Sequence, residues 1–323
     1  NSAVLFAVVC STGCNRQATK PIAKKPPVQI WGSRGAAAGE LTEPRAVAVG
    51  RKGFAYVVDT TGRLHQWTTD GKYIRSWRSP ALPYNQPEGP EGIVVLPNGD
   101  LAFTNTHASK VVLYSSTGKL LRSFGSYGTG AGQFLLVTGI TCDSEGFIYA
   151  ADYGGEFDRI SKWTQNGKLV ASWTGHGEGP RQFRRPCGLA IARDAAGRET
   201  DLLVADIGNH RIQRLDRTTG KYKGTIGKAG RKNGELNYPY GVATDLTGQI
   251  YTVEYGNHRV QKWTRDGRWI ATWGAPGRAP GQFANPRGIA VDAAQNVYIA
   301  DTMNHRVQKF RFPQAPLSQP AAP

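Results

Sequence analysis

One segment recurs six times along this chain and restricts what the chain can fold into. The clearest copies are NVYIADTMNHRVQKF at 296–310, GQIYTVEYGNHRVQKW at 248–263 and DLLVADIGNHRIQRL at 201–215, and looser copies cover 147–163, 100–114 and 54–67. Each copy is an alternating apolar segment that ends in a polar residue, followed by a Gly/Asn turn and a second alternating segment. This pattern predicts a β-hairpin. Six hairpins at a regular interval predict an all-β repeat protein.

The polar residue that ends the first segment of each hairpin sets the register of the repeat. It is found at Asp59, Asn105, Asp152, Asp206, Glu254 and Asp301, at intervals of 46 to 48 residues except for one of 54, which contains the insertion 193–201. A short apolar strand precedes each hairpin, and a Gly-containing turn and a fourth strand follow five of them. Four strands per repeat of this length predict a six-bladed β-propeller of four-stranded antiparallel blades.

The sixth repeat lacks a fourth strand of its own, because Pro313 and the tail follow Phe310 closely. VQIWG at 28–32 matches the fourth strands of the other repeats and lies one interval before Trp77. We therefore expect 28–32 to close the ring as the outer strand of the last blade, which removes two exposed sheet edges. The propeller then spans 28–312 as one domain, and its recurring Trp residues are expected to pack between blades.

Both ends of the chain differ in composition from the repeats. AVLFAVV at 3–9 suits the apolar core of a signal peptide and is too short to span a bilayer. The small residues before Cys14 resemble the bacterial lipoprotein cleavage box, although Ser11 stands where that motif usually has Leu. We expect 1–14 to be a signal peptide with lipidation at Cys14, 15–27 a Pro/Lys-rich tether and 313–323 a disordered tail.

The alternatives to lipidation are an ordinary secretory signal and a frayed apolar terminus. We expect an exported protein, which with the lipid is anchored to a bacterial membrane in the periplasm or at the cell surface. The formal net charge is +16, and four of these charges lie in 1–27. Such a charge suits nucleic acid, anionic lipid or acidic polysaccharide, or serves only solubility. Four Cys are too few for a disulfide framework, and pairing of Cys142 with Cys187 stays open.

Candidate ligand-binding residues follow from the direction of the strands. Because neighbouring strands run in opposite directions, the start of each first strand and the tip of the central hairpin emerge on one face. The inner ring on this face follows the leading Pro or its equivalent: Arg45, Glu91, Thr138, Cys187, Tyr240 and Arg287. The outer ring consists of the hairpin tips: Thr60, His107, Tyr153, His210, Tyr255, His258, Met303 and His305. The inner ring with Tyr153 and Tyr255 is the predicted ligand site.

Ring closure makes Arg45 and Arg287 neighbours, with Tyr240 next to them. Two guanidinium groups at the channel mouth suit a carboxylate, phosphate or sulfate group. The alternative is that Glu91 and the strand-end acids already neutralise both arginines. The predicted partners are therefore a protein, a glycan or a small anionic ligand bound by a monomer.

The three Asn-His-Arg histidines suggest a metal site, but their positions argue against one. His210, His258 and His305 occupy one equivalent position in three blades, too far apart to share an ion at about 2 Å from each ring. In that turn Asn tolerates the tight backbone and Arg is available to pair with the strand-end acid. We therefore expect the strand-end acids to cap turns.

The string GxGxGQF…PxGIAVD…IYxADxxNHRVQ, clearest at 277–309, 230–262 and 177–214, resembles the NHL-repeat family of six-bladed propellers. The resemblance covers 28–312 and implies the fold; it leaves open a binding scaffold, an RNA reader or an enzyme. In the family's peptide-amidating lyase, metal-binding histidines follow the leading Pro in alternate blades. The matching residues are Glu91, Cys187 and Arg287, so that metal set is missing, and Tyr153 would stand for the lyase's tyrosine.

We therefore expect a non-catalytic binding module without a cofactor. A lyase or hydrolase with a divergent metal site in the channel is the first alternative. RNA binding, suggested by the positive charge, is the second; export makes nucleic acid the less favoured partner.

Overall fold

The computed structural model describes residues 26–50, 52–78 and 89–312, which form six four-stranded sheets. Blade 1 is β2 (Pro44–Val49), β3 (Phe54–Asp59), β4 (Arg63–Thr68) and β5 (Tyr73–Arg78). Blade 2 is β6 (Gly92–Val95), β7 (Leu101–Asn105), β8 (Lys110–Tyr114) and β9 (Leu120–Phe124). Blade 3 is β10 (Leu136–Cys142), β11 (Ile148–Tyr153), β12 (Arg159–Trp163) and β13 (Leu169–Thr174).

The next two blades repeat this order. Blade 4 is β14 (Pro186–Arg193), β15 (Glu199–Asp206), β16 (Arg211–Asp216) and β17 (Tyr222–Ile226). Blade 5 is β18 (Pro239–Thr244), β19 (Ile250–Glu254), β20 (Arg259–Trp263) and β21 (Trp269–Trp273). Two three-residue 3-10 helices, η1 (Ile207–Asn209) and η2 (Thr302–Asn304), lie at hairpin tips, and no helix in the described residues is long and apolar enough to cross a membrane.

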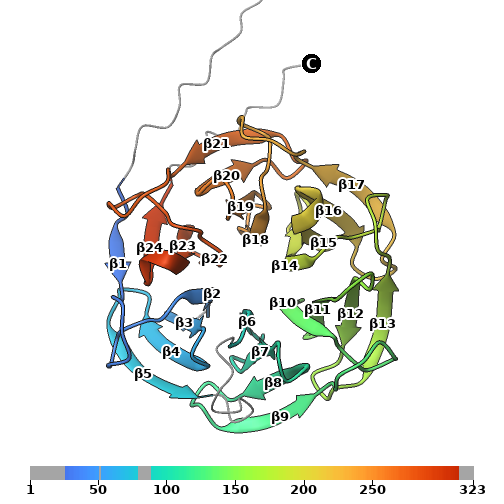
Figure 1. Ribbon diagram of the computed structural model, residues 1–323, viewed down its shortest axis with the longest axis horizontal. Helices are drawn as coiled ribbons and strands as arrows, with labels where there is room; N and C mark the ends of the chain where they lie inside the picture. Colours follow the sequence, from blue (N-terminus) through green and yellow to red (C-terminus); the bar gives the residue numbers. More distant parts are fainter. Residues whose placement is uncertain (1–25, 51, 79–88, 313–323) are drawn as a thin grey trace, which may run out of the picture.

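The sixth blade combines both ends of the propeller. It contains β22 (Ile289–Val291), β23 (Asn296–Asp301), β24 (Arg306–Arg311) and, as its outer strand, β1 (Gln29–Trp31). β1 runs antiparallel to β24, with Trp31 opposite Val307. Figure 1 shows β1 at the rim of the ring beside β24. The predicted six-bladed fold and its closure by the N-terminal strand are confirmed; the predicted signal peptide with Cys14, most of the tether and the tail lie outside the described residues.

The hydrophobic core is divided into six main clusters among the described residues, each between two adjacent blades. In the cluster that joins blades 6 and 1, Trp31 stacks on Trp67 with ring centroids 5.9 Å apart. Six tryptophans are buried in such clusters: Trp31, Trp67, Trp163, Trp173, Trp263 and Trp273. Their predicted role in packing between blades is confirmed.

Each first strand lies nearest the axis of the ring (Figure 1), and most are irregular where they begin. The pairing register shifts after Pro44, Val137, Pro186 and Pro239, which is the signature of a β-bulge. A bulge re-aims the side chains next to it. In every blade except the first, a glycine follows the inner-ring residue, and it lets neighbouring first strands touch: a Cβ at Gly241 would lie 2.6 Å from the Arg287 carbonyl oxygen. The inner-ring side chains therefore project from the starts of first strands whose backbones contact one another.

Candidate functional site

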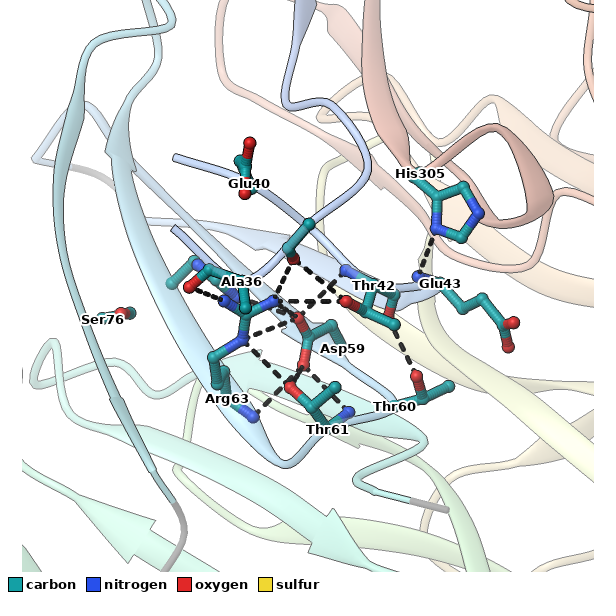
Figure 2. Close-up of polar contacts among 12 residues, drawn as sticks. Ala36, Glu40, Thr42, Glu43, Asp59, Thr60, Thr61, Arg63, Ser76 and His305 are labelled. Carbon is teal, nitrogen blue, oxygen red and sulfur yellow. Dashed lines mark hydrogen bonds and ion pairs between the residues drawn. The ribbon is translucent and has the colours of Figure 1, made fainter. Parts of the chain in front are cut away.

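Donors enclose the carboxylate of Asp59, the first of the strand-end acids (Figure 2). Arg63 Nη2 donates to Asp59 Oδ2 at 2.7 Å, and the Thr61 hydroxyl donates to Oδ1 at 2.6 Å. The Thr42 backbone N–H and the His65 ring are also within hydrogen-bond distance. Burial alone would raise the pKa of Asp59, but the hydrogen bonds from His65 and Thr61 and the charge of Arg63 outweigh burial and lower the pKa to about 2. Asp59 is thus a charged turn cap with occupied oxygens.

The same cap recurs around the ring. Four further strand-end acids pair with the arginine that begins the next strand at 2.6–2.8 Å: Arg159–Asp152, Arg211–Asp206, Arg259–Glu254 and Arg306–Asp301. In the three Asn-His-Arg turns the Asn side chain also donates to the acid: Asn209 to Asp206, Asn257 to Glu254 and Asn304 to Asp301. The predicted capping role of these acids is confirmed in five blades.

The three Asn-His-Arg histidines connect one blade to the next. His305 Nδ1 accepts a hydrogen bond from the Glu43 backbone N–H at 3.1 Å (Figure 2). His210 does the same for Tyr238, and His258 for Asn285, both at 3.0 Å. Burial lowers the pKa of all three histidines, which favours the neutral ring that can accept at Nδ1. Each histidine therefore serves a separate blade junction.

Five of the six inner-ring residues line one small depression on the ring axis: Arg45, Glu91, Cys187, Tyr240 and Arg287. We call these five residues the axial site. The depression has a volume of about 70 Å³ and a floor that includes the glycines behind the bulges. Thr138 does not line it, because its hydroxyl is buried and donates to the Pro186 carbonyl at 3.0 Å. The ligand-binding role of all these residues stays a prediction.

One carboxylate in the axial site faces two arginines. Glu91 Oε1 contacts Arg45 Nη1 and lies 3.5 Å from Arg287 Nη1. Glu91 therefore pairs with both, as the alternative from the sequence anticipated, but its single charge balances only one of them. The Nε of Arg287 is buried and lacks a hydrogen-bond acceptor among the described residues. A donor of this kind is costly to leave unsatisfied, and an anion would satisfy it.

Aromatic rings hold the Arg287 guanidinium in place. Its carbon lies 4.8 Å from the centre of the Tyr240 ring and 5.5 Å from that of Tyr255. Such cation–π contacts orient the guanidinium without neutralising its charge. Tyr255 was predicted from the hairpin tip of the same blade as Tyr240, and the structure brings both tyrosines to one arginine.

Arg185 is a third arginine of this region, which the sequence analysis missed. Its guanidinium lies 5.1 Å from the centre of the Tyr153 ring, and its charge acts on Cys187 together with those of Arg287 and Arg45. Arg185 precedes the leading Pro of blade 4 and has a φ of 56°. Glu43, Tyr238 and Asn285, at the matching positions of other blades, also have a positive φ. The sequence could therefore have indicated Arg185 if the residue before each leading Pro had been considered together with the residue after it.

The remaining polar groups of the axial site are neutral at ordinary pH. Burial raises the pKa of the Cys187 thiol to about 11 and that of Tyr240 to about 12. Cys142 is also a free thiol, and burial raises its pKa to about 12. Neither cysteine is therefore an activated nucleophile, and the pairing of Cys142 with Cys187 is not formed.

The axial site does not fit the metal centre of the amidating lyase. Of the three matching residues, Arg287 cannot bind a cation, Glu91 is engaged by arginines, and the Cys187 thiol stays protonated. No group of three His, Cys, Asp or Glu residues suited to a metal ion is found in the described part of the chain.

The repeat, the closed ring and the axial site define an NHL-type six-bladed propeller. The NHL repeat model matches residues 283–310, and the model of the SMP-30/Gluconolactonase/LRE-like region matches 45–284. The chain therefore belongs to the SMP-30/gluconolactonase/LRE-like family.

Curated relatives are similar over part of their length. Human NHL repeat-containing protein 3 is 28% identical over 188 residues, which cover 55% of this chain and 50% of that protein. Protein brain tumor of Drosophila melanogaster is 33% identical over 91 residues, or 28% of this chain and 8% of that protein. The chain thus spans about half of the first relative and a small part of the second.

Solved structures share the fold at low identity. A gluconolactonase of Xanthomonas campestris is 14% identical with a TM-score of 0.62, covering 89% of this chain and 97% of that one. A catalytically inactive virginiamycin B lyase of Staphylococcus aureus with quinupristin is 18% identical with a TM-score of 0.58, covering 86% and 82%. At these identities the likeness shows the propeller fold alone.

Proposed function

We propose that this propeller is a non-catalytic binding module that recognises an anionic group of its ligand at the axial site. The observation that carries the proposal is Arg287, whose buried Nε lacks an acceptor while Glu91 is shared with Arg45. Two arginines pair with one carboxylate, which leaves one positive charge in excess, and the charge of Arg185 also acts on Cys187 in this site.

The dimensions of the axial site restrict the ligand to one small group inserted on the axis. A volume of about 70 Å³ admits a carboxylate, phosphate or sulfate but not the body of a larger molecule. The rest of the ligand, whether a small molecule, a glycan or a protein segment, would lie on the face around Tyr153 and Tyr255. Arginine suits such groups because its planar guanidinium forms paired, charge-assisted hydrogen bonds.

The test uses inorganic phosphate as the probe at low ionic strength, with binding measured by isothermal titration calorimetry. We expect Arg287→Gln to weaken phosphate binding about tenfold, since a charge-assisted hydrogen bond and the net charge are lost together. Arg268→Gln is the matched control, because Arg268 is exposed in the β20–β21 hairpin at the opposite face and pairs only with exposed Asp266. Equal affinities of wild type and Arg287→Gln would overturn the assignment.

A second candidate function is hydrolysis of a lactone, which the family match over 45–284 favours through the gluconolactonase in its name. The axial site offers this reaction neither an activated nucleophile nor an unpaired general base, because Cys187 and Tyr240 stay protonated and Glu91 is paired with two arginines. Elemental analysis of the purified 28–312 propeller and a gluconolactone hydrolysis assay with added divalent cations test this candidate. We expect no stoichiometric metal and no rate above that of the buffer; the opposite results would favour the enzyme.

We also propose that the chain is exported and lipid-anchored through Cys14. The support is the apolar run at 3–9 and the small residues before Cys14, all outside the described residues. Expression of the complete precursor in a bacterium with a labelled fatty acid tests this. We expect label in the wild type and none in Cys14→Ser; label in neither protein would contradict the anchor.

A further inference from the structure

A second and larger cavity lies at the opposite end of the first strands from the axial site. Its volume is about 690 Å³, which lies within the range of small-molecule sites in proteins. Val49, Val95 and Cys142, the last residues of β2, β6 and β10, contribute to its lining together with the neighbouring hairpins. The axial site lies where the same strands begin, so the two sites open on different faces. We call this second site the blade 1–2 cavity.

A departure from the repeat creates this cavity. In blades 3, 5 and 6 an acid just after the first strand accepts a hydrogen bond from a buried tyrosine: Tyr149 to Asp143, Tyr251 to Asp245 and Tyr298 to Asp292, at 2.8–3.1 Å. In blade 1 the acid is replaced by Gly50, although Tyr56 is kept. In blade 2 Leu96 and Ala102 replace the acid and the tyrosine. Gly50 and Leu96, at two of the positions where those blades carry the acid, line the cavity.

Arg75 gives the blade 1–2 cavity a fixed positive charge. Its Nε donates to Gln66 Oε1 at 2.8 Å and its Nη2 donates to the Ser116 carbonyl at 3.0 Å. Gln66 in turn donates to the Tyr56 hydroxyl oxygen at 3.2 Å, so the Tyr56 proton can be donated to a ligand. No carboxylate of the described residues lies within ion-pair distance of Arg75. The guanidinium is therefore positioned by neutral partners and keeps its charge.

The acids that line the blade 1–2 cavity are already paired. Arg193 Nη2 donates to Glu199 Oε1 at 2.5 Å, and Arg217 Nη1 donates to Asp143 Oδ2 at 2.9 Å. The unbalanced charge is thus positive and lies on the blade 1 side. Apolar side chains supply much of the remaining wall: Val49, Phe54, Ile74, Val95, Leu96 and Pro97.

We propose that the blade 1–2 cavity binds an amphipathic organic anion, with its carboxylate on Arg75 and Tyr56 and its hydrocarbon part against the apolar wall. An apolar wall with a few convergent polar groups is the common design of such sites. This site is independent of the axial site, because the two share no residue and lie on opposite faces.

The probe is decanoate below its micellar concentration, with decanol as the uncharged counterpart, and binding to the full chain is measured by calorimetry. We expect decanoate to bind at least about tenfold more tightly than decanol, because only the anion satisfies Arg75. Arg75→Gln should reduce that preference, and Lys52, which also lines the cavity, keeps part of the positive charge. Arg122→Gln is the matched control, since Arg122 holds the same repeat position one blade on, reaches Asn166 and does not line the cavity.

A second variant restores the repeat instead of removing a charge. Gly50→Asp returns the acid that accepts from tyrosine in blades 3, 5 and 6, and a Cβ at Gly50 would meet only Val95 Cγ1 closely, at 3.3 Å. We expect this variant to fold, to place a carboxylate beside Arg75 and to lose decanoate binding. Decanol binding as tight as decanoate binding, no binding of either probe, or undiminished decanoate binding by Arg75→Gln or Gly50→Asp would each overturn the proposal.

Discussion

At the scale of single residues, the histidines show that the role of a side chain depends on its neighbours. Three of them lie at matching hairpin tips, and the Nδ1 of each accepts a hydrogen bond from a backbone N–H of the next blade. The residue that donates has a positive φ in each case: Glu43, Tyr238 and Asn285. In blade 3 Asp158 replaces the histidine and accepts from Arg185, which also has a positive φ. At each junction where it occurs, this contact stabilises a residue whose backbone has a positive φ.

The histidine contacts predict that stability falls in mild acid. Burial lowers the pKa of His258 in the fold below the value of about 6.5 in the unfolded chain. The unfolded state then binds the proton first, so the stabilising contribution is complete above about pH 6.5 and is lost as the pH falls through the lowered pKa. Urea unfolding of the wild type at about pH 7.5 and about pH 5 should show this loss.

Replacing one histidine separates the hydrogen bond from other effects of acid. His258→Ala should cost about 1 kcal/mol of unfolding free energy at neutral pH and should reduce the loss of stability in acid. Met303→Ala, which truncates an exposed and non-titratable side chain at the hairpin tip of blade 6, is the control and should change neither quantity. A pH dependence that stays the same in His258→Ala would contradict the assigned role.

At the scale of elements, the starts of the first strands carry both the packing and most of the axial site. In blade 5 the pairing register shifts after Pro239, next to the inner-ring residue Tyr240, and the glycine that follows lets the next strand approach. Gly241 shows the constraint, since a Cβ there would lie 2.6 Å from the Arg287 carbonyl oxygen and 2.9 Å from Val253 Cγ1. The backbone of Arg287 can lie this close to blade 5 because Gly241 has no side chain.

Gly241→Ala should therefore disturb both stability and the axial site. Overpacking against a backbone atom typically costs about 1–3 kcal/mol, and the displaced Arg287 should also bind phosphate less tightly. Gly50→Ala is the control, because its nearest neighbour is the movable side chain of Val95 at 3.3 Å. Chemical denaturation and the phosphate titration measure the two effects; a fully stable Gly241→Ala variant with unchanged phosphate binding would show that the strands do not need this contact.

The parts that repeat were predictable from the sequence, and the parts that depend on departures from the repeat were not. The six hairpins, the closing strand and the caps at Asp206 and Asp301 follow from residues that recur in register. Arg185 was missed because its place in the fold depends on a positive φ and a backbone contact with Asp158, 27 residues away. The blade 1–2 cavity was missed because Gly50 contributes through the side chain that it lacks, and the blades that line the cavity meet only in the folded ring.

At the scale of the whole molecule, closure is a single contact region between distant parts of the chain. β1 joins the last blade through three paired residues, and Trp31 packs on both sides of the junction, with Tyr298 of blade 6 and Trp67 of blade 1. Lys309 Nζ also donates to the Thr69 carbonyl across the same junction, at 2.8 Å. Without β1, β24 would be an exposed edge able to pair with another chain.

Trp31→Ala should therefore weaken the entire ring and not only its rim. Truncating a buried aromatic side chain typically costs about 3–5 kcal/mol, and here the loss falls on the one junction that the N-terminal strand completes. Ile30→Ala is the control on the same strand, because Ile30 is 39% exposed and faces away from the cluster while Trp31 is 4% exposed. Denaturant unfolding should place Trp31→Ala far below Ile30→Ala, and sedimentation should show self-association of Trp31→Ala through the loosened β24 edge. Equal stabilities of the two variants would mean that the other five junctions hold the ring without this one.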